Sequence, residues 1–101
     1  MPYKDKKYYV YILASKPYGV LYIGVTSNLF SRIDKHRKAY YGEGFTNKYF
    51  VHLLVHYEVY GEIFLAIRRE KNLKKWNRQW KLNLIVRNNP SWRDLYKEVY
   101  S

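Results

Sequence analysis

Hydrophobic residues along this chain follow two different periods, which separate strands from helices. Every residue of Tyr8–Leu13 is aromatic or aliphatic, which is typical of a strand with both faces buried. The proline and glycine within Lys16–Gly19 predict a turn, and Val20–Val25 then returns as the second strand of a hairpin. A third strand is predicted at Val51–Tyr60, where two sets of residues alternate with the period of a strand.

Helical spacing of hydrophobic residues takes over in the other segments. A stripe of apolar residues predicts a helix that begins near Asn28, with Thr26 or Ser27 as its cap. A loop with two glycines follows at 41–47, and further helices are expected at about 62–75 and 78–87. Asn89-Pro90-Ser91 starts a last helix with one apolar face. The stripe residues are Leu29, Ile33 and Tyr40 in the first helix and Trp92, Leu95, Tyr96 and Val99 in the last.

The predicted order ββαβααα is that of a three-stranded antiparallel sheet covered by helices, an α+β fold. A chain of 101 residues has room for one core, so residues 1–101 are expected to form a single domain. No apolar run approaches the ~18 residues needed to span a bilayer, and the basic N-terminus lacks the apolar core of a signal peptide. Cysteine is absent, which excludes disulfides and thiolate metal sites. We expect a cytoplasmic protein with no membrane contact.

The net charge of +11 is spread over both halves of the chain. Such a field attracts polyanions, and nucleic acid is the commonest polyanion in a cytoplasm. The chain also has 13 Tyr and 3 Trp, whose rings can stack on bases but mostly fill the core of a small domain. Charge alone is equally compatible with a ribosome-associated protein or a merely soluble basic protein.

One glutamate interrupts an otherwise apolar helix face. The stripe runs Ile63, Ala66, Ile67, Glu70 and Leu73. Glu70 is also the only acidic residue among the seven basic residues of 68–81. A buried carboxylate is costly unless it is paired or bound to a metal. An ion pair with arginine or lysine and a metal ligand are therefore the two interpretations.

Two residues of the first predicted helix are candidates for phosphate chemistry. Arg32 and His36 are one helical turn apart and so share a face. An arginine can hold a phosphate with two hydrogen bonds and stabilise developing charge. A histidine with its pKa near ~6.5 can hold or relay a proton at neutral pH. Because Lys35, Arg37 and Lys38 are neighbours, a solvated basic face is the alternative interpretation.

Two tyrosine tripeptides complete the pattern. Tyr9–Tyr11 reads Y-V-Y in the first predicted strand, and Tyr22–Gly24 reads Y-I-G in the second. Arg32 follows the tyrosine of the second tripeptide by ten residues, with His36 one turn later and Glu70 on a later helix. In this combination the chain resembles the GIY-YIG nuclease superfamily over nearly its whole length.

The resemblance is closest to small stand-alone bacterial members, which are related to the N-terminal nuclease domain of a bacterial excinuclease. Tyr9 and Val10 replace the glycine and the isoleucine of the family's first motif. Neither side chain carries chemistry in the family scheme, so these departures concern the geometry and not the reaction. The resemblance implies the fold predicted above and the metal-dependent cutting of a phosphodiester.

The resemblance also implies a role for each motif residue. Arg32 would hold the scissile phosphate, and Glu70 would bind one Mg²⁺ or Mn²⁺. Tyr11 or Tyr22, with help from His36, would orient or deprotonate the attacking water. Which tyrosine acts as the base stays open, because a phenol with its pKa near ~10 is a poor base unless cations lower that pKa. The alternative for each tyrosine is core packing with a hydrogen-bonded hydroxyl.

Six further residues are candidates for binding nucleic acid. Asn83 is the nearest match to a family asparagine that follows the glutamate helix, although Asn72 and Asn77 compete with it. The segment Phe45–Tyr49 resembles one that recurs in the stand-alone members; phosphate contacts are expected from it, and a surface loop without function is the alternative. The six residues are Thr46, Lys48, Arg68, Lys74, Arg78 and Asn83.

The sequence therefore predicts a divalent-metal-dependent endonuclease that hydrolyses DNA, with a place in DNA repair or processing. A single compact basic domain contacts the backbone more than the bases, which predicts low sequence specificity. Targeting by a partner protein is an equal alternative. RNA is an alternative substrate, because no residue recognisably reads a 2′-hydroxyl. The alternative function is a non-catalytic nucleic-acid-binding module on the same fold, with the basic segment 68–81 and its two tryptophans as the binding surface.

Overall fold

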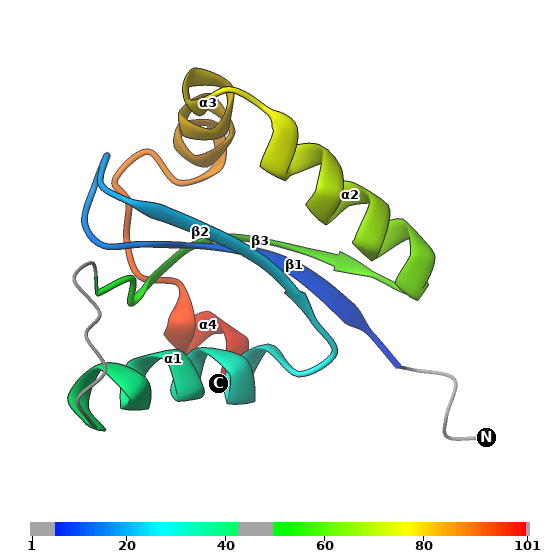
Figure 1. Cartoon of the computed structure of the whole chain (residues 1–101), viewed down its shortest axis with the longest axis horizontal. Helices are drawn as coiled ribbons and strands as arrows, with labels where there is room; N and C mark the ends of the chain where they lie inside the picture. The colour runs from blue at the N-terminus through cyan, green and yellow to red at the C-terminus, as the bar shows by residue number, and fades with distance from the viewer. Residues whose placement is uncertain (1–5, 43–49, 101) are drawn as a thin grey trace.

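A three-stranded antiparallel sheet lies between two layers of helices in the computed structural model of the chain (Figure 1). The structure describes residues 6–42 and 50–100, without the side chains of 39–42 and 100. The strand order is β2-β1-β3. In chain order the elements are β1 Tyr8–Ala14, β2 Leu21–Thr26, α1 Leu29–Gly42, β3 Leu53–Tyr60, α2 Ile63–Lys75, α3 Arg78–Asn88 and α4 Tyr96–Tyr100. The predicted α+β fold and its order ββαβααα are confirmed.

Strand β1 is buried on both faces, because it is the central strand and helices cover the sheet from either side. Val10, Ile12 and Ala14 pack in the core under α2 and α3. Tyr11 and Leu13 pack in the core on the side of α1 and α4. All five side chains are 0% exposed. The unbroken apolar run of the sequence is what such a doubly buried strand requires.

Along strand β3, the side of the sheet to which alternate side chains point changes at one position. His56 pairs with Ile12, which belongs to the core under α2, whereas Leu54 pairs with Leu13 in the core on the α1 side. The register of the pairing shifts between Ile12 and Leu13, as at a β-bulge. A period of two, continued through the whole strand, would have placed Leu54 and His56 on one face. β3 also begins two residues later than predicted.

Helix α1 begins at Leu29 and has a different cap from the predicted one. The Asn28 side-chain oxygen accepts a hydrogen bond from the backbone N–H of Ser31 at 3.0 Å, so Asn28 is the cap. Thr26 contributes indirectly, since its hydroxyl oxygen accepts a hydrogen bond from the Asn28 N–H at 3.0 Å. The prediction of Thr26 or Ser27 as the cap was therefore wrong.

The C-terminal helix is shorter than the sequence pattern predicted. α4 covers only Tyr96–Tyr100, and Trp92 has a positive φ of 54°, which a right-handed helix does not contain. Trp92 is 5% exposed in the core under α2 and α3, whereas Leu95 packs in the core on the α1 side. The single apolar face predicted for this segment was wrong, because the chain crosses here from one side of the sheet to the other (Figure 1).

Hydrogen bonds to the first residues of β3 hold this crossing in place. The side chain of Asn89 is 3% exposed. It donates to the carbonyl oxygens of Val55 at 3.1 Å and Arg93 at 2.9 Å, and it accepts from the Arg93 N–H at 3.1 Å. The Leu95 N–H donates to the Leu54 carbonyl oxygen at 2.8 Å. The loop between α3 and α4 is thus attached to the sheet through both main-chain and side-chain groups.

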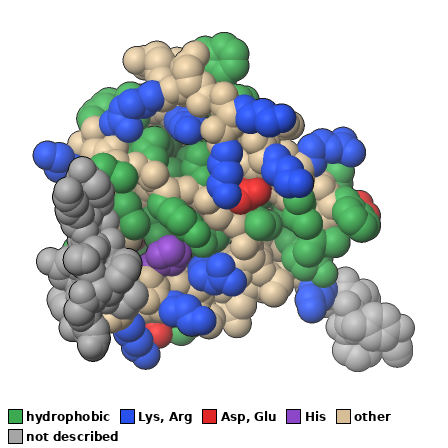
Figure 2. Space-filling view, in the orientation of Figure 1, with side chains coloured by type: hydrophobic (Ala, Val, Ile, Leu, Met, Phe, Trp, Pro, Cys, Tyr) green, Lys and Arg blue, Asp and Glu red, His purple; other side chains and the backbone are tan. Residues whose placement is uncertain are grey.

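Basic side chains dominate the charged surface. On the face shown in Figure 2 they lie over the helices above and below the sheet, with hydrophobic side chains between them and few acidic ones. This distribution agrees with the net charge of +11. None of the helices within residues 6–42 and 50–100 is long and apolar enough to cross a membrane.

Candidate active site

Tyr11 is a fully buried tyrosine whose hydroxyl makes no hydrogen bond to the described part of the chain. Burial raises the pKa of Tyr11 to about 12, with the Tyr22 phenol adding to the rise and the Arg32 guanidinium opposing it. A buried polar group without a partner lowers stability. The polar groups that act on the Tyr11 hydroxyl are the Tyr22 phenol and the Arg32 guanidinium, both of them motif residues, and the catalytic role of Tyr11 stays a prediction.

Gly24 makes room for the ring of Tyr11. The two residues pair across β1 and β2. A Cβ atom at Gly24 would lie 2.5 Å from the Tyr11 hydroxyl oxygen and 2.7 Å from Cζ, closer than van der Waals contact allows. The glycine of the Y-I-G motif is thus required by the side chain of the tyrosine in the other motif.

Tyr22, Arg32, Lys35 and His36 line an open pocket of about 440 Å³ on the α1 side of the sheet. Tyr22 projects from β2 and is 41% exposed. The His36 ring meets Tyr22 edge to face, with 4.9 Å between centroids, and its centroid is 6.3 Å from that of Tyr11. The two tyrosine rings are 6.2 Å apart. Four of the five motif residues therefore form one cluster, here called the α1 cluster: Tyr11, Tyr22, Arg32 and His36.

The surroundings of His36 determine its protonation. Burial lowers the pKa of His36 below 6.5, and the positive charge of Arg32 one turn away lowers this pKa further. The imidazole is therefore mostly neutral at neutral pH. In that form it can accept a proton from water or another group in the pocket.

Arg32 has no carboxylate partner among the described residues, in contrast to Arg37, the other arginine of α1. Arg37 pairs with Asp94 at 2.6 Å, and Lys38 pairs with Asp34 at 3.1 Å. Arg32 is exposed and lines the pocket. On a merely solvated basic face, the two arginines would have similar surroundings. The difference between them favours Arg32 as the group that receives a phosphate.

Glu70 lies on α2, on the other side of the sheet from the α1 cluster. Its side chain is 13% exposed, and its Oε2 is 2.5 Å from Lys74 Nζ. Buried Ala66 and Leu73 flank it on the helix face toward the sheet, as predicted, but Ile63 at the start of the stripe is 38% exposed. The structure records no contact between Glu70 and the α1 cluster, and α2 packs on β2, which lies between them. The ion pair that was one interpretation of Glu70 is present, with Lys74 as the partner.

Glu70 fits a divalent metal as a single protein ligand. Within residues 6–42 and 50–100, no group of three or more His, Cys, Asp or Glu side chains is placed to hold a metal ion. Mg²⁺ does not need such a group, because waters and substrate phosphate oxygens can complete its coordination. A pair within one helix whose lysine is 54% exposed stabilises little. Lys74 therefore leaves the Glu70 carboxylate available to another cation.

The other predicted nucleic-acid contacts differ in how the structure holds them. Thr46 and Lys48 lie outside the described residues. Arg68 is exposed on α2, whereas Arg78 donates to two carbonyl oxygens of the β1–β2 turn at 2.6 and 2.8 Å. Asn83 lines a small pocket beside two tryptophans on the α2–α3 side. Their roles in binding, like that of Lys74, stay predictions.

A half-buried ionic cluster on β3 and α2 was not predicted from the sequence. Glu58 is 2.8 Å from His56 Nε2 and accepts hydrogen bonds from Tyr60 Oη at 2.8 Å and from Arg69 at 2.8 and 2.9 Å. Burial acts to raise the pKa of Glu58, but these bonds outweigh it and bring the pKa to about 2. In the sequence, the alternation of His56, Glu58 and Tyr60 indicates that these side chains share one face of the strand. Only the position of Arg69 on α2 shows that this face is covered by a helix.

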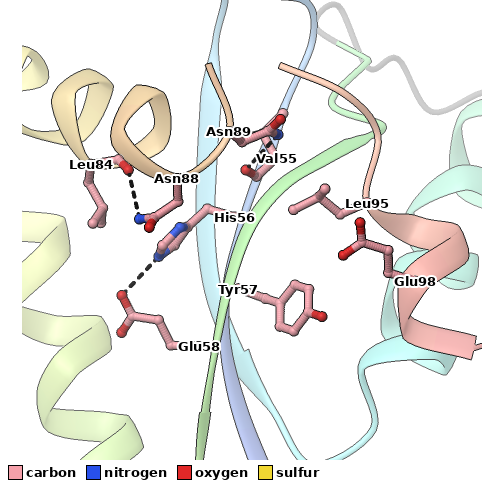
Figure 3. A pocket seen from close by; sticks show the side chains of 9 residues that line it. All are labelled: Val55, His56, Tyr57, Glu58, Leu84, Asn88, Asn89, Leu95 and Glu98. Atoms are coloured by element: carbon pink, nitrogen blue, oxygen red, sulfur yellow. Dashed lines mark hydrogen bonds and ion pairs between the residues drawn. The ribbon is translucent and has the colours of Figure 1, made fainter. Parts of the chain in front are cut away.

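A second pocket of about 390 Å³ opens over β3 between α3 and α4. Figure 3 shows His56, Glu58 and Asn88 on one side of the strand and Tyr57, Leu95 and Glu98 on the other. The pocket contains none of the motif residues. Its acidic side chains are already paired, one with His56 and Arg69 and the other with Arg93. It is therefore a weaker candidate for chemistry than the pocket of the α1 cluster.

The sheet and the α1 cluster together define the nuclease-like fold of the GIY-YIG catalytic domain. Residues 7–83 match the family model with that description, and the chain belongs to the GIY-YIG family. It is 37% identical over 82 residues to a UPF0213 protein of Syntrophus aciditrophicus (strain SB), covering 81% of this chain and 93% of that protein. It is 38% identical over 79 residues to UPF0213 protein SH2523 of Staphylococcus haemolyticus (strain JCSC1435), covering 78% and 94%. No solved structure was found to match the chain.

Proposed function

We propose that the protein is a divalent-metal-dependent endonuclease that hydrolyses DNA phosphodiester bonds with little sequence specificity, in DNA repair or processing. The observation that carries the proposal is the α1 cluster: a phenol, a histidine with a lowered pKa and an arginine without a carboxylate partner line one open pocket, and the buried phenol of Tyr11 lies beside them. These groups suit the binding and hydrolysis of a phosphate diester. Family membership implies a nucleic acid substrate in general.

Each residue of the α1 cluster has a role that follows from its surroundings. Arg32 donates hydrogen bonds to the scissile phosphate and stabilises the negative charge that grows in the transition state. His36, mostly neutral at neutral pH, accepts or relays the proton of the attacking water. Tyr11 keeps its proton because its pKa is about 12, so it acts as a hydrogen-bond donor. Tyr22 is the tyrosine exposed to the pocket and is therefore the one that orients or deprotonates the water.

Glu70 is the residue that would hold Mg²⁺ or Mn²⁺. Its carboxylate is largely removed from water, which strengthens its attraction for a cation. A divalent ion held there would supply stabilisation of negative charge on a phosphodiester. Because β2 is an edge strand of the sheet, a substrate that meets both Glu70 and the α1 cluster would pass over that edge. The neighbouring Lys74 can turn from the Glu70 carboxylate to a phosphate of the same substrate, because its side chain is 54% exposed.

A non-catalytic nucleic-acid-binding module is the second candidate, and the contact between Glu70 and Lys74 favours it. In such a module the pair would be structural, and the basic surface alone would hold the nucleic acid. Salt-sensitive binding is expected of both candidates. Dependence of cutting on a metal separates them.

The test is a cleavage assay on end-labelled single-stranded, duplex, nicked and branched DNA and on single-stranded RNA, with Mg²⁺, Mn²⁺ or chelator. Arg32→Ala and Glu70→Gln should each lower metal-dependent cutting by about a hundredfold or more. Lys38→Ala is the matched control, since it removes an exposed cation of the same helix as Arg32, and it should cut normally. Cutting that survives in both test variants would refute the assigned site. Binding without cutting on any substrate, unchanged in Glu70→Gln, would establish the non-catalytic module instead.

A further inference from the structure

Two tryptophans where α2 meets α3 form an exposed aromatic corner. Trp80 is 55% exposed, and its ring stands at 86° to that of Trp76, with 5.7 Å between centroids. The Arg69 guanidinium lies 5.2 Å from the centroid of the Trp76 ring, a cation–π contact. Arg69 is itself held by two hydrogen bonds to Glu58. Trp76 is thus supported from the protein side, while Trp80 presents its ring to solvent.

The two rings line a pocket of about 180 Å³ together with Asn83, Leu84 and Arg87, here called the tryptophan pocket. The Asn83 side-chain oxygen accepts a hydrogen bond from Gln79 at 2.9 Å, so its N–H groups are free to donate. Arg87 makes no hydrogen bond or ion pair with the described residues. An aromatic wall, a free amide and an unpaired guanidinium are the groups that bind the face of a base, its polar edge and a phosphate.

The charge around the tryptophan pocket selects nucleic acid as the occupant. Within 68–81 the only acidic residue is Glu70, and Lys74 is in contact with it. Four further cations on α2 and α3 have no ion-pair partner in the described part of the chain, and a strand of phosphates complements them. They are Arg68, Lys71, Lys75 and Lys81.

We propose that the tryptophan pocket binds one unpaired base of a nucleic acid strand, with an adjoining phosphate on Arg87. The inference rests on the proposed function and deepens it, since it names an unpaired segment as part of the substrate. A base inside an intact duplex is stacked on both faces and cannot reach a protein ring without being extruded. A single strand, a flap or a gap offers such a base directly.

The test measures binding in the presence of chelator, so that the result does not depend on cleavage. Fluorescence anisotropy of labelled oligothymidylate, oligouridylate and a blunt duplex is recorded at fixed salt. Base–aromatic stacking contributes enough that Trp80→Ala should weaken single-strand binding by about 5- to 100-fold, with a much smaller effect on the duplex. Trp80→Phe keeps an aromatic ring and should recover most of the affinity. Comparison of the thymidylate with the uridylate distinguishes DNA from RNA as the source of the base.

Phe64→Ala is the matched control, because Phe64 is a 70% exposed aromatic residue of α2 outside the tryptophan pocket. It should leave binding unchanged. Intrinsic fluorescence adds a second readout: Trp92 is 5% exposed, so quenching by the oligonucleotide reports on Trp76 and Trp80. Unchanged single-strand binding in Trp80→Ala, or an equal loss in Phe64→Ala, overturns the proposal. Failure of the nuclease proposal is distinguishable, because it appears as absent cutting while the single-strand binding and its loss in Trp80→Ala remain.

Discussion

The ring of Tyr11 lies against Gly24 on the neighbouring strand, so the two tyrosine motifs meet in one contact. No glycine among the described residues has a positive φ, and Gly24 therefore serves by its lack of a side chain and not by its backbone angles. The contact fixes the ring of Tyr11, whose centroid lies 6.2 Å from that of Tyr22 and 6.3 Å from that of His36. The position of the buried phenol thus depends on a residue that carries no chemistry itself.

Substitution Gly24→Ala should disturb both the fold and the pocket. The added methyl group would displace the Tyr11 ring within a packed core, which typically lowers the free energy of unfolding by about 1–3 kcal/mol. Cleavage should fall at least about tenfold, because small displacements of positioned groups are costly to catalysis. Urea unfolding and the cleavage assay measure the two effects.

The matched control is Gly61→Ala, since a Cβ atom at Gly61 meets nothing within 4 Å and its φ is not positive. The free energy of unfolding of that variant should lie within about 1 kcal/mol of that of the parent. Any difference should be a stabilisation. Equal stability of Gly24→Ala and Gly61→Ala would contradict the close contact with Tyr11.

Acid should lower both the proposed cleavage and the stability through His36. Its folded-state pKa is below 6.5, so the imidazole stays neutral as the pH falls through 6.5 and becomes charged only at lower pH. The unfolded chain takes up that proton at a higher pH, and the free energy of unfolding should therefore decrease as the pH falls from about 6.5.

Arg32→Gln removes the positive charge that helps to lower the pKa of His36. It should move this pKa part of the way back toward 6.5, since burial remains. NMR titration of the histidine rings checks this, with Lys38→Gln as a control that should not shift His36.

Glu58→Gln should cost about 3 kcal/mol of unfolding free energy at neutral pH, because it removes the charge that His56, Tyr60 and Arg69 share. The pKa of Glu58 is lowered from 4.5 to about 2. The stabilisation by Glu58 is therefore present above pH 4.5 and is lost as the pH falls through about 2, and Glu58→Gln should flatten this acid dependence. Glu98→Gln, at a 46% exposed carboxylate paired with Arg93, should change stability by less than about 1 kcal/mol. Urea unfolding at several pH values measures both variants. Similar losses of stability in Glu58→Gln and Glu98→Gln would contradict the network around Glu58.

Asn89→Ala should lower the free energy of unfolding by about 2–4 kcal/mol, because it leaves buried backbone groups of Val55 and Arg93 without partners. The neighbouring Asn88 is an exposed residue with one hydrogen bond of 3.2 Å to a carbonyl of its own helix. Asn88→Ala should therefore cost less than about 1 kcal/mol. Thermal unfolding of the two variants compares them directly, and a difference near zero would mean that the α3–α4 crossing does not depend on Asn89.

The central strand and the two helices after β3 could be predicted from the sequence because their patterns are long and local. An unbroken apolar run has one stable location in such a fold, the doubly buried β1. The existence of the last helix could be predicted, but its first residue and the side of the sheet that each of its residues faces could not. Trp92 and Leu95 have helical spacing, yet they fill two different cores, and the positive φ at Trp92 comes from the crossing past β3. Local periodicity contains no information about which side of a sheet the chain will reach.

The sequence by itself determined the family, the order of the elements and the residues that meet in the α1 cluster. The order of the elements follows from turn signals and hydrophobic spacing, which act over a few residues, and the family and its motif residues follow from the resemblance to GIY-YIG nucleases. Only the tertiary structure decided that Arg32 lacks a carboxylate partner while Arg37 has one, that Glu58 is held ionised by Arg69, and that Trp76 and Trp80 share a pocket with Arg87. The physical reason is that burial, hydrogen bonding and charge pairing depend on groups far apart in the chain, and folding alone brings these groups together.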